Sequence, residues 1–294
     1  MAWIPSTAAP RKPAIGRPSV DPSSWRSPSG APLQRRALCG LARPCLKQPQ
    51  RTPRFMFHEA TLLLIVSGQL DLDDGTNRMS MDTPASLLLV EPNTCADLLK
   101  TPGGTEQCFR SVFLTFPAAL LDGFHRDYPA TRTGPRPASP FRSAALDRDL
   151  TATLCHVLES VEESSLSDER LRHRLMDLLL ALAERGHCFG HADLDSTSGR
   201  LRTLIGEAPE RHWTAEVAGK ELAMSAATLR RRLASEHARF EDLLIDVRMH
   251  HAMMLVQTTA WAMTRIAEAC GYKSRARFAE RFQDRFGYPP STVR

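Results

Sequence analysis

Hydrophobic and polar residues follow a β-strand period in the first half of the chain. An apolar run fills residues 60–66, and strict alternation follows over residues 69–73. The dipeptide Asp74-Gly75 is a strong hairpin signal, and a second apolar run covers residues 86–90. Short strands separated by turn residues at this spacing are typical of a β-sandwich or barrel. We therefore predict a β domain between residues 56 and 128.

Beyond a proline-rich linker at residues 129–140, the apolar period becomes helical. The spacing predicts one helix over residues 144–162 and another over residues 168–185, which Ser167 would cap. The second helix carries a stripe of leucines: Leu171, Leu175, Leu178, Leu179 and Leu182. Two interpretations of this stripe stay open, because it could form a dimer seam or pack on the β domain of its own chain. A polar stretch at residues 190–199 is the expected linker to the next domain.

The last stretch, from Ile266 to Arg294, has the pattern of a helix-turn-helix. A short helix would end at Gly271, where a positive φ costs glycine little, and Ser274 would cap the next helix. One face of that helix carries a phenylalanine every four residues, at Phe278, Phe282 and Phe286. Gly287 and the prolines after it would end the helix.

A looser copy of this pattern lies upstream. Ser225 would cap a helix that runs through the segment ATLRRRLA, whose inward side carries Leu229 and Leu233. The outward side of the same helix carries Arg230 and Arg231. A further apolar helix, over about residues 240–257, would join the two copies.

These motifs resemble the DNA-binding domain of AraC/XylS-type transcription regulators. The resemblance is carried by residues of the second copy: Ile266-Ala267, Gly271-Tyr272, Phe278, Phe282, Gly287, Pro290 and Arg294. It implies an α+β chain whose all-α DNA-binding domain, residues 197–294, holds two helix-turn-helix units. It also implies a cupin-like β-barrel sensor domain at residues 56–128, marked by SGQLDLDDG and SLLLVEP, and a helical dimerisation segment at residues 141–188.

The resemblance also implies DNA-contacting positions, residue by residue. Recognition helices of this type enter the major groove by their N-terminal residues. The base-contacting positions of the two units match Ala226, Ala227, Arg230, Arg231, Arg275, Ala276 and Glu280. The positions placed for phosphate contacts are Lys273, Arg277, Arg281 and Thr214.

The sequence departs from the family pattern at three positions. Glu280 stands where the family often has arginine, Gln283 where lysine is common, and Val293 where an aromatic residue is usual. Glu280 matters most, because phosphates repel a carboxylate. On a DNA face it is favourable if it accepts a bond from cytosine N4. The alternative is that it pairs with Arg277 or Arg281 and orients them.

The first 55 residues differ from the rest in composition. Prolines recur throughout, and Asp21 is the only acidic residue among many arginines and lysines. Such a segment buries too little apolar surface to offset its chain entropy. We expect a disordered basic arm at residues 1–55, either in contact with DNA or without a role. Translation from Met56 would remove it altogether.

Charge and cysteine content narrow the class of protein. The net charge of +5 and the pI of about 9.0 suit a polyanionic partner. No apolar run approaches the roughly 20 residues of a membrane helix, so no membrane partner is expected. The seven cysteines are scattered and form no CxxC pair, which favours a reduced, cytoplasmic protein.

Catalytic chemistry is not indicated. The sequence contains no GxSxG, GxxxxGK[ST] or HExxH motif, so we expect no enzyme. His58-Glu59 is the only His/Glu pair of the β region, and His58 is expected to be an ordinary strand-edge residue. His250 and His251 are adjacent and so point to different sides of their helix. We therefore expect no metal and no cofactor.

The resemblance implies a sequence-specific transcription regulator, an activator, in the bacterial cytoplasm and on the nucleoid when bound to DNA. Its implied partners are promoter DNA, RNA polymerase, a second copy of the chain, and a small-molecule or protein effector at the N-terminal domain. Two alternatives stay open. An architectural, weakly specific DNA binder would direct most of its basic residues to phosphates, and a cupin-type enzyme would need a metal cluster.

Overall fold

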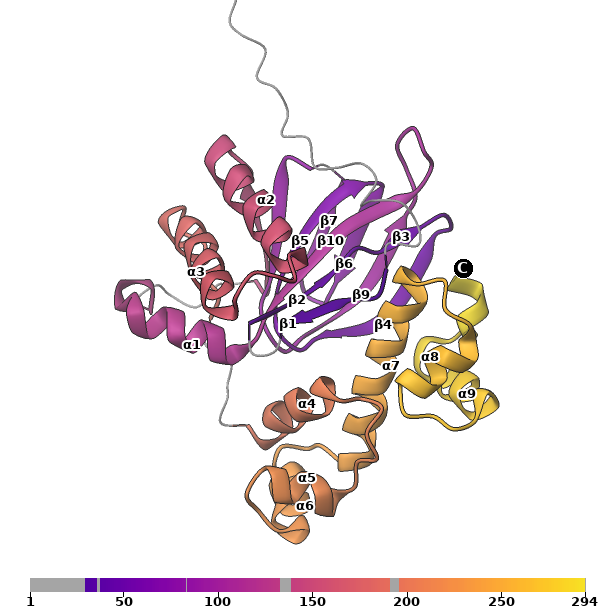
Figure 1. Cartoon of the computed structure of the whole chain (residues 1–294). Helices are drawn as coiled ribbons and strands as arrows, with labels where there is room; N and C mark the ends of the chain where they lie inside the picture. The colour runs from indigo at the N-terminus through magenta and orange to yellow at the C-terminus, as the bar shows by residue number, and fades with distance from the viewer. Residues whose placement is uncertain (1–29, 36–37, 83, 133–138, 191–195, 294) are drawn as a thin grey trace, which may run out of the picture.

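The computed structural model describes residues 30–35, 38–82, 84–132, 139–190 and 196–293. As predicted, the fold is mixed α+β, with a β-rich N-terminal domain and a helical C-terminal domain (Figure 1). Of the helices in these ranges, none has both the length and the apolar character needed to cross a membrane.

The larger of two antiparallel sheets is buried on both faces. Its strands lie in the order β1 (Leu33–Arg35), β2 (Cys39–Ala42), β10 (Phe109–Phe116), β5 (Ala60–Ser67), β8 (Ser86–Val90) and β11 (Phe141–Ala145), and β3 (Cys45–Leu46) also pairs with β10. Leu62 and Leu89 face covering helices, whereas Ile65 and Leu88 face the second sheet. Burial on both sides explains why the central strands are unbroken apolar runs.

The smaller sheet has the order β4 (Gln50–Phe57), β9 (Thr94–Thr101), β6 (Gln69–Asp73) and β7 (Arg78–Met81). The predicted hairpin joins β6 to β7, with Gly75 at a φ of +90°. Strand β4 lies at the edge of this sheet, where one row of its backbone groups has no strand partner. That edge position decides where the C-terminal domain docks.

The predicted disordered arm is wrong for the part of it that the structure describes. Residues 30–55 contain β1 to β3 and most of β4, so translation from Met56 would delete four strands wholly or in large part. Prolines are tolerated because Pro53 lies on an edge strand. Two basic residues bind helix ends: Arg35 donates to the Leu166 carbonyl at 2.7 Å, and Arg43 pairs with Glu162. The prediction for residues 1–29 lies outside the described residues.

Helices α1 (Ala118–Asp127), α2 (Arg148–Glu162) and α3 (Asp168–Glu184) cover the outer face of the larger sheet (Figure 1). Ser167 caps α3 as predicted, but residues 144 and 145 belong to β11, and α2 begins only after its cap Asp147. The leucine stripe of α3 lies in the core shared with the sheet; Leu175 is 0% and Leu179 is 3% exposed. The stripe is therefore not a dimer seam.

The C-terminal domain contains the two predicted helix-turn-helix units and their joining helix. The first unit comprises α5 (Ala215–Glu221) and α6 (Ala226–Ser235), preceded by α4 (Thr197–Glu207). The joining helix is α7 (Phe240–Thr258), and the second unit comprises α8 (Met263–Ala269) and α9 (Arg275–Phe286), followed by a 3₁₀ turn, η3 (Pro290–Val293). Gly271 and Gly287 have φ values of +75° and +85°, so both glycines sit where the sequence placed them.

The two units have different cores. The first unit packs with α4 and the start of α7 in a core of its own, which includes Ile205, Leu229 and Leu233. The second unit shares one core with the β domain, in which Phe278 and Phe282 belong to the same cluster as Phe57. Figure 1 shows α7, α8 and α9 gathered beside β4, whereas α5 and α6 lie away from the sheets.

Candidate nucleic-acid interface and domain joint

Helix α6 presents the residues that the sequence assigned to the first recognition helix. Ser225 caps it, and its hydroxyl accepts from the Thr228 N–H at 3.1 Å. Leu229 and Leu233 are fully buried, which turns Ala227, Arg230 and Arg231 to the exposed side. Ala226 is half-buried beside the cap. A small exposed residue at the helix start, followed one turn later by arginines, suits entry into a major groove.

Arg230 is held by an acidic neighbour. Its Nη2 donates to Glu216 Oε1 of α5 at 3.1 Å, and both side chains are more than half exposed. Ion pairs as exposed as this one are weak, so a guanine or a phosphate could displace Glu216. Thr214 caps α5 by accepting from the Val217 N–H at 3.2 Å. A phosphate in contact with Thr214 would therefore lie at the N-terminus of α5, which favours anions.

Helix α9 carries the residues that the sequence assigned to the second recognition helix. Ser274 accepts from the Arg277 N–H at 3.4 Å, and three buried phenylalanines hold one face of the helix inward. The other face exposes Arg275, Ala276, Arg277 and Glu280, with Lys273 just before the cap.

The contacts of Arg281 and Glu280 test whether Glu280 pairs with a neighbouring arginine. Arg281 is half-buried and lies 3.8 Å from Asp284 Oδ2. Among the described residues, no hydrogen bond or ion pair joins Glu280 to Arg277 or Arg281. The sequence hypothesis that Glu280 orients one of these arginines therefore has no contact to support it.

The turns of the two units adopt the same left-handed backbone with different residues. Gly271 has a φ of +75°, and Ala223 has a φ of +58° at the corresponding place. Arg248 of α7 fixes the distance between the units: its guanidinium donates to the carbonyls of Pro209 and Arg211, both at 2.9 Å. A Cβ on Gly271 would approach Arg248 Nη2 to 2.4 Å, so this contact also explains the glycine.

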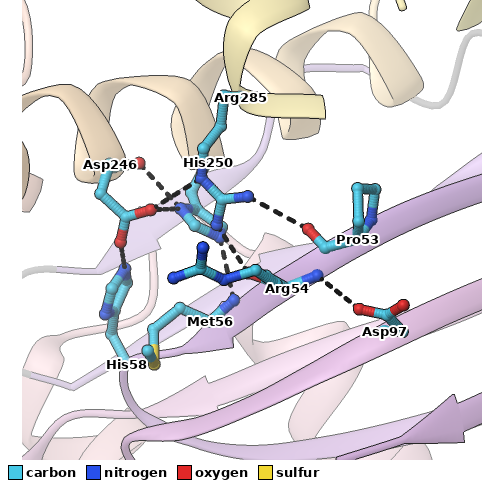
Figure 2. Close-up of polar contacts among 8 residues, drawn as sticks. All are labelled: Pro53, Arg54, Met56, His58, Asp97, Asp246, His250 and Arg285. Carbon is cyan, nitrogen blue, oxygen red and sulfur yellow. Dashed lines mark hydrogen bonds and ion pairs between the residues drawn. The ribbon is translucent and has the colours of Figure 1, made fainter. Parts of the chain in front are cut away.

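A joint between the second unit and the edge strand β4 was missed by sequence reasoning. Arg285 of α9 donates to the carbonyl of Pro53 at 3.1 Å, to that of Arg54 at 2.6 Å and to Asp246 Oδ1 of α7 at 3.0 Å (Figure 2). The Tyr288 hydroxyl donates to the Arg51 carbonyl at 2.6 Å. Side chains of the C-terminal domain thus satisfy the open backbone groups of a sheet edge.

Two histidines complete the joint. His250 of α7 accepts from the Met56 N–H of β4 through Nε2 at 2.9 Å, and its Nδ1 donates to the Asp246 carbonyl at 2.7 Å (Figure 2). His58, after β4, lies with its ring 5.3 Å from that of His250 and with Nε2 3.9 Å from Asp246 Oδ2. Both ring nitrogens of His58 are buried without a hydrogen-bond partner among the described residues. The sequence analysis took His58 for an ordinary strand-edge residue and gave His250 no role at a domain contact.

The electrostatics of the joint favour neutral histidines. Burial lowers the pKa of His58 well below its usual range, and the charges of His250 and Arg202 lower it further, while Asp246 opposes them. Burial also lowers the pKa of His250. Burial disfavours the Asp246 carboxylate, yet His250, His58 and Arg285 hold the pKa of Asp246 below its usual range.

His58, Asp246 and His250 place their ligand atoms within 4.8 Å of one another. A metal ion needs a free lone pair from each ligand. Both nitrogens of His250 are engaged with backbone groups, and Arg285 already holds the Asp246 carboxylate. The set is therefore arranged as a hydrogen-bonded joint rather than as a metal centre.

A second polar contact across the joint centres on Lys100 of β9. Lys100 is 6% exposed, and its ammonium donates to Gln257 Oε1 of α7 at 2.8 Å, while Gln257 donates to Gln50 Oε1 of β4 at 2.6 Å. No carboxylate of the described residues bonds to it, and burial lowers the pKa of Lys100 to about 7. A buried lysine whose hydrogen-bond partner is a neutral amide lacks a counter-charge, so a bound anion would stabilise its charged form.

Comparison with known proteins places these features in a family. The profile described as "Helix-turn-helix domain" matches residues 219–294. The regulator YdeO of Escherichia coli is 30% identical over 170 residues, which are 55% of this chain and 64% of YdeO. The urease operon transcriptional activator of Escherichia coli is 28% identical over 140 residues, 46% of this chain and 47% of that protein. The chain thus spans less than two thirds of each of these relatives.

Solved structures extend the likeness to the whole fold. ToxT from Vibrio cholerae, in a structure with an unsaturated fatty acid bound, superposes with a TM-score of 0.56 at 14% identity. The match covers 88% of this chain and 95% of ToxT, so the β-rich domain and the helical domain occur together there as well. The C-terminal helix-turn-helix domain of this chain is therefore similar to that of AraC/XylS-type transcription regulators, as the sequence motifs implied.

Proposed function

We propose that this protein is a sequence-specific DNA-binding regulator that activates transcription under the control of its N-terminal domain. The observation that carries the proposal is the pair of capped recognition helices, α6 and α9, which precede and follow α7 in the chain. Each exposes arginines beside a small residue at its start. Two such helices would read successive major-groove segments about one helical turn apart.

Promoter DNA and RNA polymerase are the proposed partners, and the bacterial cytoplasm and nucleoid the proposed place of action. The named relatives include an activator of the urease operon and the virulence regulon activator VirF of Shigella flexneri, 24% identical over 137 residues. These names support activation rather than repression here. Self-association with a second copy would need a surface other than the buried leucine stripe of α3.

Selection of bound sequences from a random DNA library, with the purified full chain, tests the proposal. We expect one preferred motif, and Arg231→Ala should relax it at one base position with a loss of about 1–3 kcal/mol. Arg281→Ala should weaken binding to all DNA sequences alike, and it should reduce the slope of log affinity against log salt concentration by about one. Arg170→Ala, an exposed arginine of α3, is the matched control and should change neither.

A library that yields no motif, with binding that depends only on salt, would identify an architectural binder instead. Unchanged binding in both Arg231→Ala and Arg281→Ala would contradict the assignment of the groove-facing residues.

For the effector, we propose a carboxylic acid held at Lys100. ToxT has been solved with an unsaturated fatty acid and with a naphthalenyl butenoic acid, both carboxylic acids. In this chain a carboxylate would replace Gln257 as the partner of the buried Lys100 ammonium, at the contact between β9 and α7. Such a ligand would act on the joint between the two domains directly.

Titration calorimetry with an unsaturated fatty acid and with its methyl ester tests this effector. Binding of the acid alone, lost in Lys100→Met, is the expected result. The loss should be about 10- to 100-fold, as for a hydrogen bond to a charged group. Equal affinity for acid and ester would show that Lys100 does not recognise the carboxylate.

A further inference from the structure

We propose that His58 and His250 make the joint between β4 and α7 a proton-operated latch, closed near neutral pH and opened by mild acid. The inference rests on the proposed function only for its consequence, the release of the second DNA-binding unit. The latch itself is a property of the joint and can be measured without DNA.

The contacts of His250 require a neutral ring. Its Nε2 accepts from the Met56 N–H, so a proton on Nε2 would turn this hydrogen bond into a contact between two donors. Its Nδ1–H already donates to the Asp246 carbonyl, so no tautomer keeps both bonds once the ring is charged. Protonation would therefore break a direct link between β4 and α7 (Figure 2).

Neither ring nitrogen of His58 has a hydrogen-bond acceptor among the described residues that would stabilise the protonated ring. The charged groups that act on it most strongly all come from the C-terminal domain: His250 and Asp246 from α7, Arg285 from α9 and Arg202 from α4. Asp246 is the one anion of the set, and Arg285 already binds it at 3.0 Å. A charged His58 would add a cation beside two arginines, with its ring 5.3 Å from a second titrating ring. Both ring nitrogens are shielded from water in the closed joint, and separation of the domains would hydrate them.

The sign of the effect follows from the direction of the shifts. Both histidines have a lowered pKa in the closed joint and would regain their usual value, about 6.5, once the joint opens. The open state therefore binds more protons, and the stability of the closed state falls as pH falls below about 6.5. Each histidine should change the closed-to-open ratio about tenfold between pH 7.5 and 5.5, so the pair should change it about a hundredfold.

Hydrogen exchange of the full chain, read by mass spectrometry and corrected for intrinsic exchange rates, measures the opening. We expect residues 50–57 of β4 and 243–257 of α7 to lose about a hundredfold in protection between pH 7.5 and 5.5. Residues 60–67 of β5, inside the larger sheet, should keep theirs. Unchanged protection of β4 and α7 over this range would overturn the proposal.

Variants separate the latch from a general effect of acid. His58→Gln and His250→Gln should each remove about tenfold of the pH dependence, and the double variant should be nearly flat. His251→Gln is the matched control, because half-buried His251 also has a pKa lowered by burial, but its charged neighbour is Glu210. It should keep the full pH dependence. Should His250→Gln fail to fold, His58→Gln and His58→Asn carry the test.

Two further outcomes are decisive. A double variant that keeps the wild-type slope would overturn the proposal. So would increased exchange on adding EDTA at pH 7.5, because a metal ion would then hold the joint. If the latch opens as expected but the full chain selects no DNA motif, the proposed function fails while the latch stands.

Discussion

The two helix-turn-helix units have the same local design but different neighbours. Both are capped by serine, both turn through a left-handed residue, and both expose arginines on the second helix. The first unit has a core of its own, whereas the second shares its core with the β domain and is bound to β4 through Arg285 and Tyr288. The comparison shows that two copies of one motif can differ in the contacts that hold them, because the β domain packs against the second unit only.

The largest expected effect comes from removing the β domain. A fragment of residues 197–294 should keep the first unit intact, because its core needs nothing from the sheets. The second unit and the face of α7 toward the sheets would lose the β-domain side chains that pack against them. We expect protection against hydrogen exchange in α8 and α9 to fall about a hundredfold or more, with little change in α5 and α6. Equal protection of both units in the fragment would show that the shared core contributes nothing.

Arg285→Ala should open the joint in the intact chain. It leaves two carbonyls of β4 and the Asp246 carboxylate without their partner in a partly buried place. We expect a loss of about 2–3 kcal/mol in the stability of the closed state. Thermal unfolding followed by circular dichroism measures it, with Arg281→Ala as the control on the same helix. A drop in Arg281→Ala as large as in Arg285→Ala would contradict the assignment.

Sequence reasoning succeeded where the determinants are local. Serine caps, the glycine at the turn and phenylalanines four residues apart act within a few residues, so α6, α7 and α9 appear close to their predicted bounds. It failed at the joint, where Arg285 and Pro53 are 232 residues apart in the chain. No periodicity marks a side chain that meets the backbone of a distant strand.

The composition of the first 55 residues also misled the prediction. Averaged over the segment, proline and arginine indicate disorder, yet the part from residue 30 onward forms strands. Strand β2 has the sequence CGLA and is wholly buried. The average composition of the segment hid this short apolar stretch. Arg35 and Arg43 are not solvated charges, because they bind the ends of α2 and α3. A segment this short is better judged residue by residue than by its mean composition.

Exchanging the turn residues tests whether the two units differ only in environment. Gly271→Ala adds a Cβ that would meet Arg248 Nη2 at 2.4 Å and the Pro209 carbonyl at 2.9 Å, at a φ of +75°. We expect a loss of about 2 kcal/mol in the free energy of unfolding. Ala223→Gly should instead stabilise the first unit by about 0.5–1 kcal/mol, because glycine relieves a left-handed alanine. Chemical denaturation measures both, and destabilisation in both would refute the equivalence of the turns.

The smallest expected effect concerns Glu280, a carboxylate at the position where α6 has Arg231. It is exposed on the proposed DNA face of α9, and Arg281 lies by Asp284 rather than by Glu280. A carboxylate repelled by phosphates is favourable there if it accepts a bond from cytosine N4. Glu280→Ala should then cost about 1 kcal/mol of discrimination at one C·G pair, at the low end for a base contact, with the salt slope unchanged.

The matched control for Glu280 is Asp284→Ala, which removes the carboxylate that Arg281 approaches on the same helix. It should alter the overall affinity through Arg281 and leave the preference at every base position as it was. Binding of single-substituted sites at two salt concentrations separates the two effects. If Glu280→Ala changes affinity alike on all sites, Glu280 orients its neighbours and reads no base. The two recognition helices would then differ in their partners and not in the chemistry of their readout.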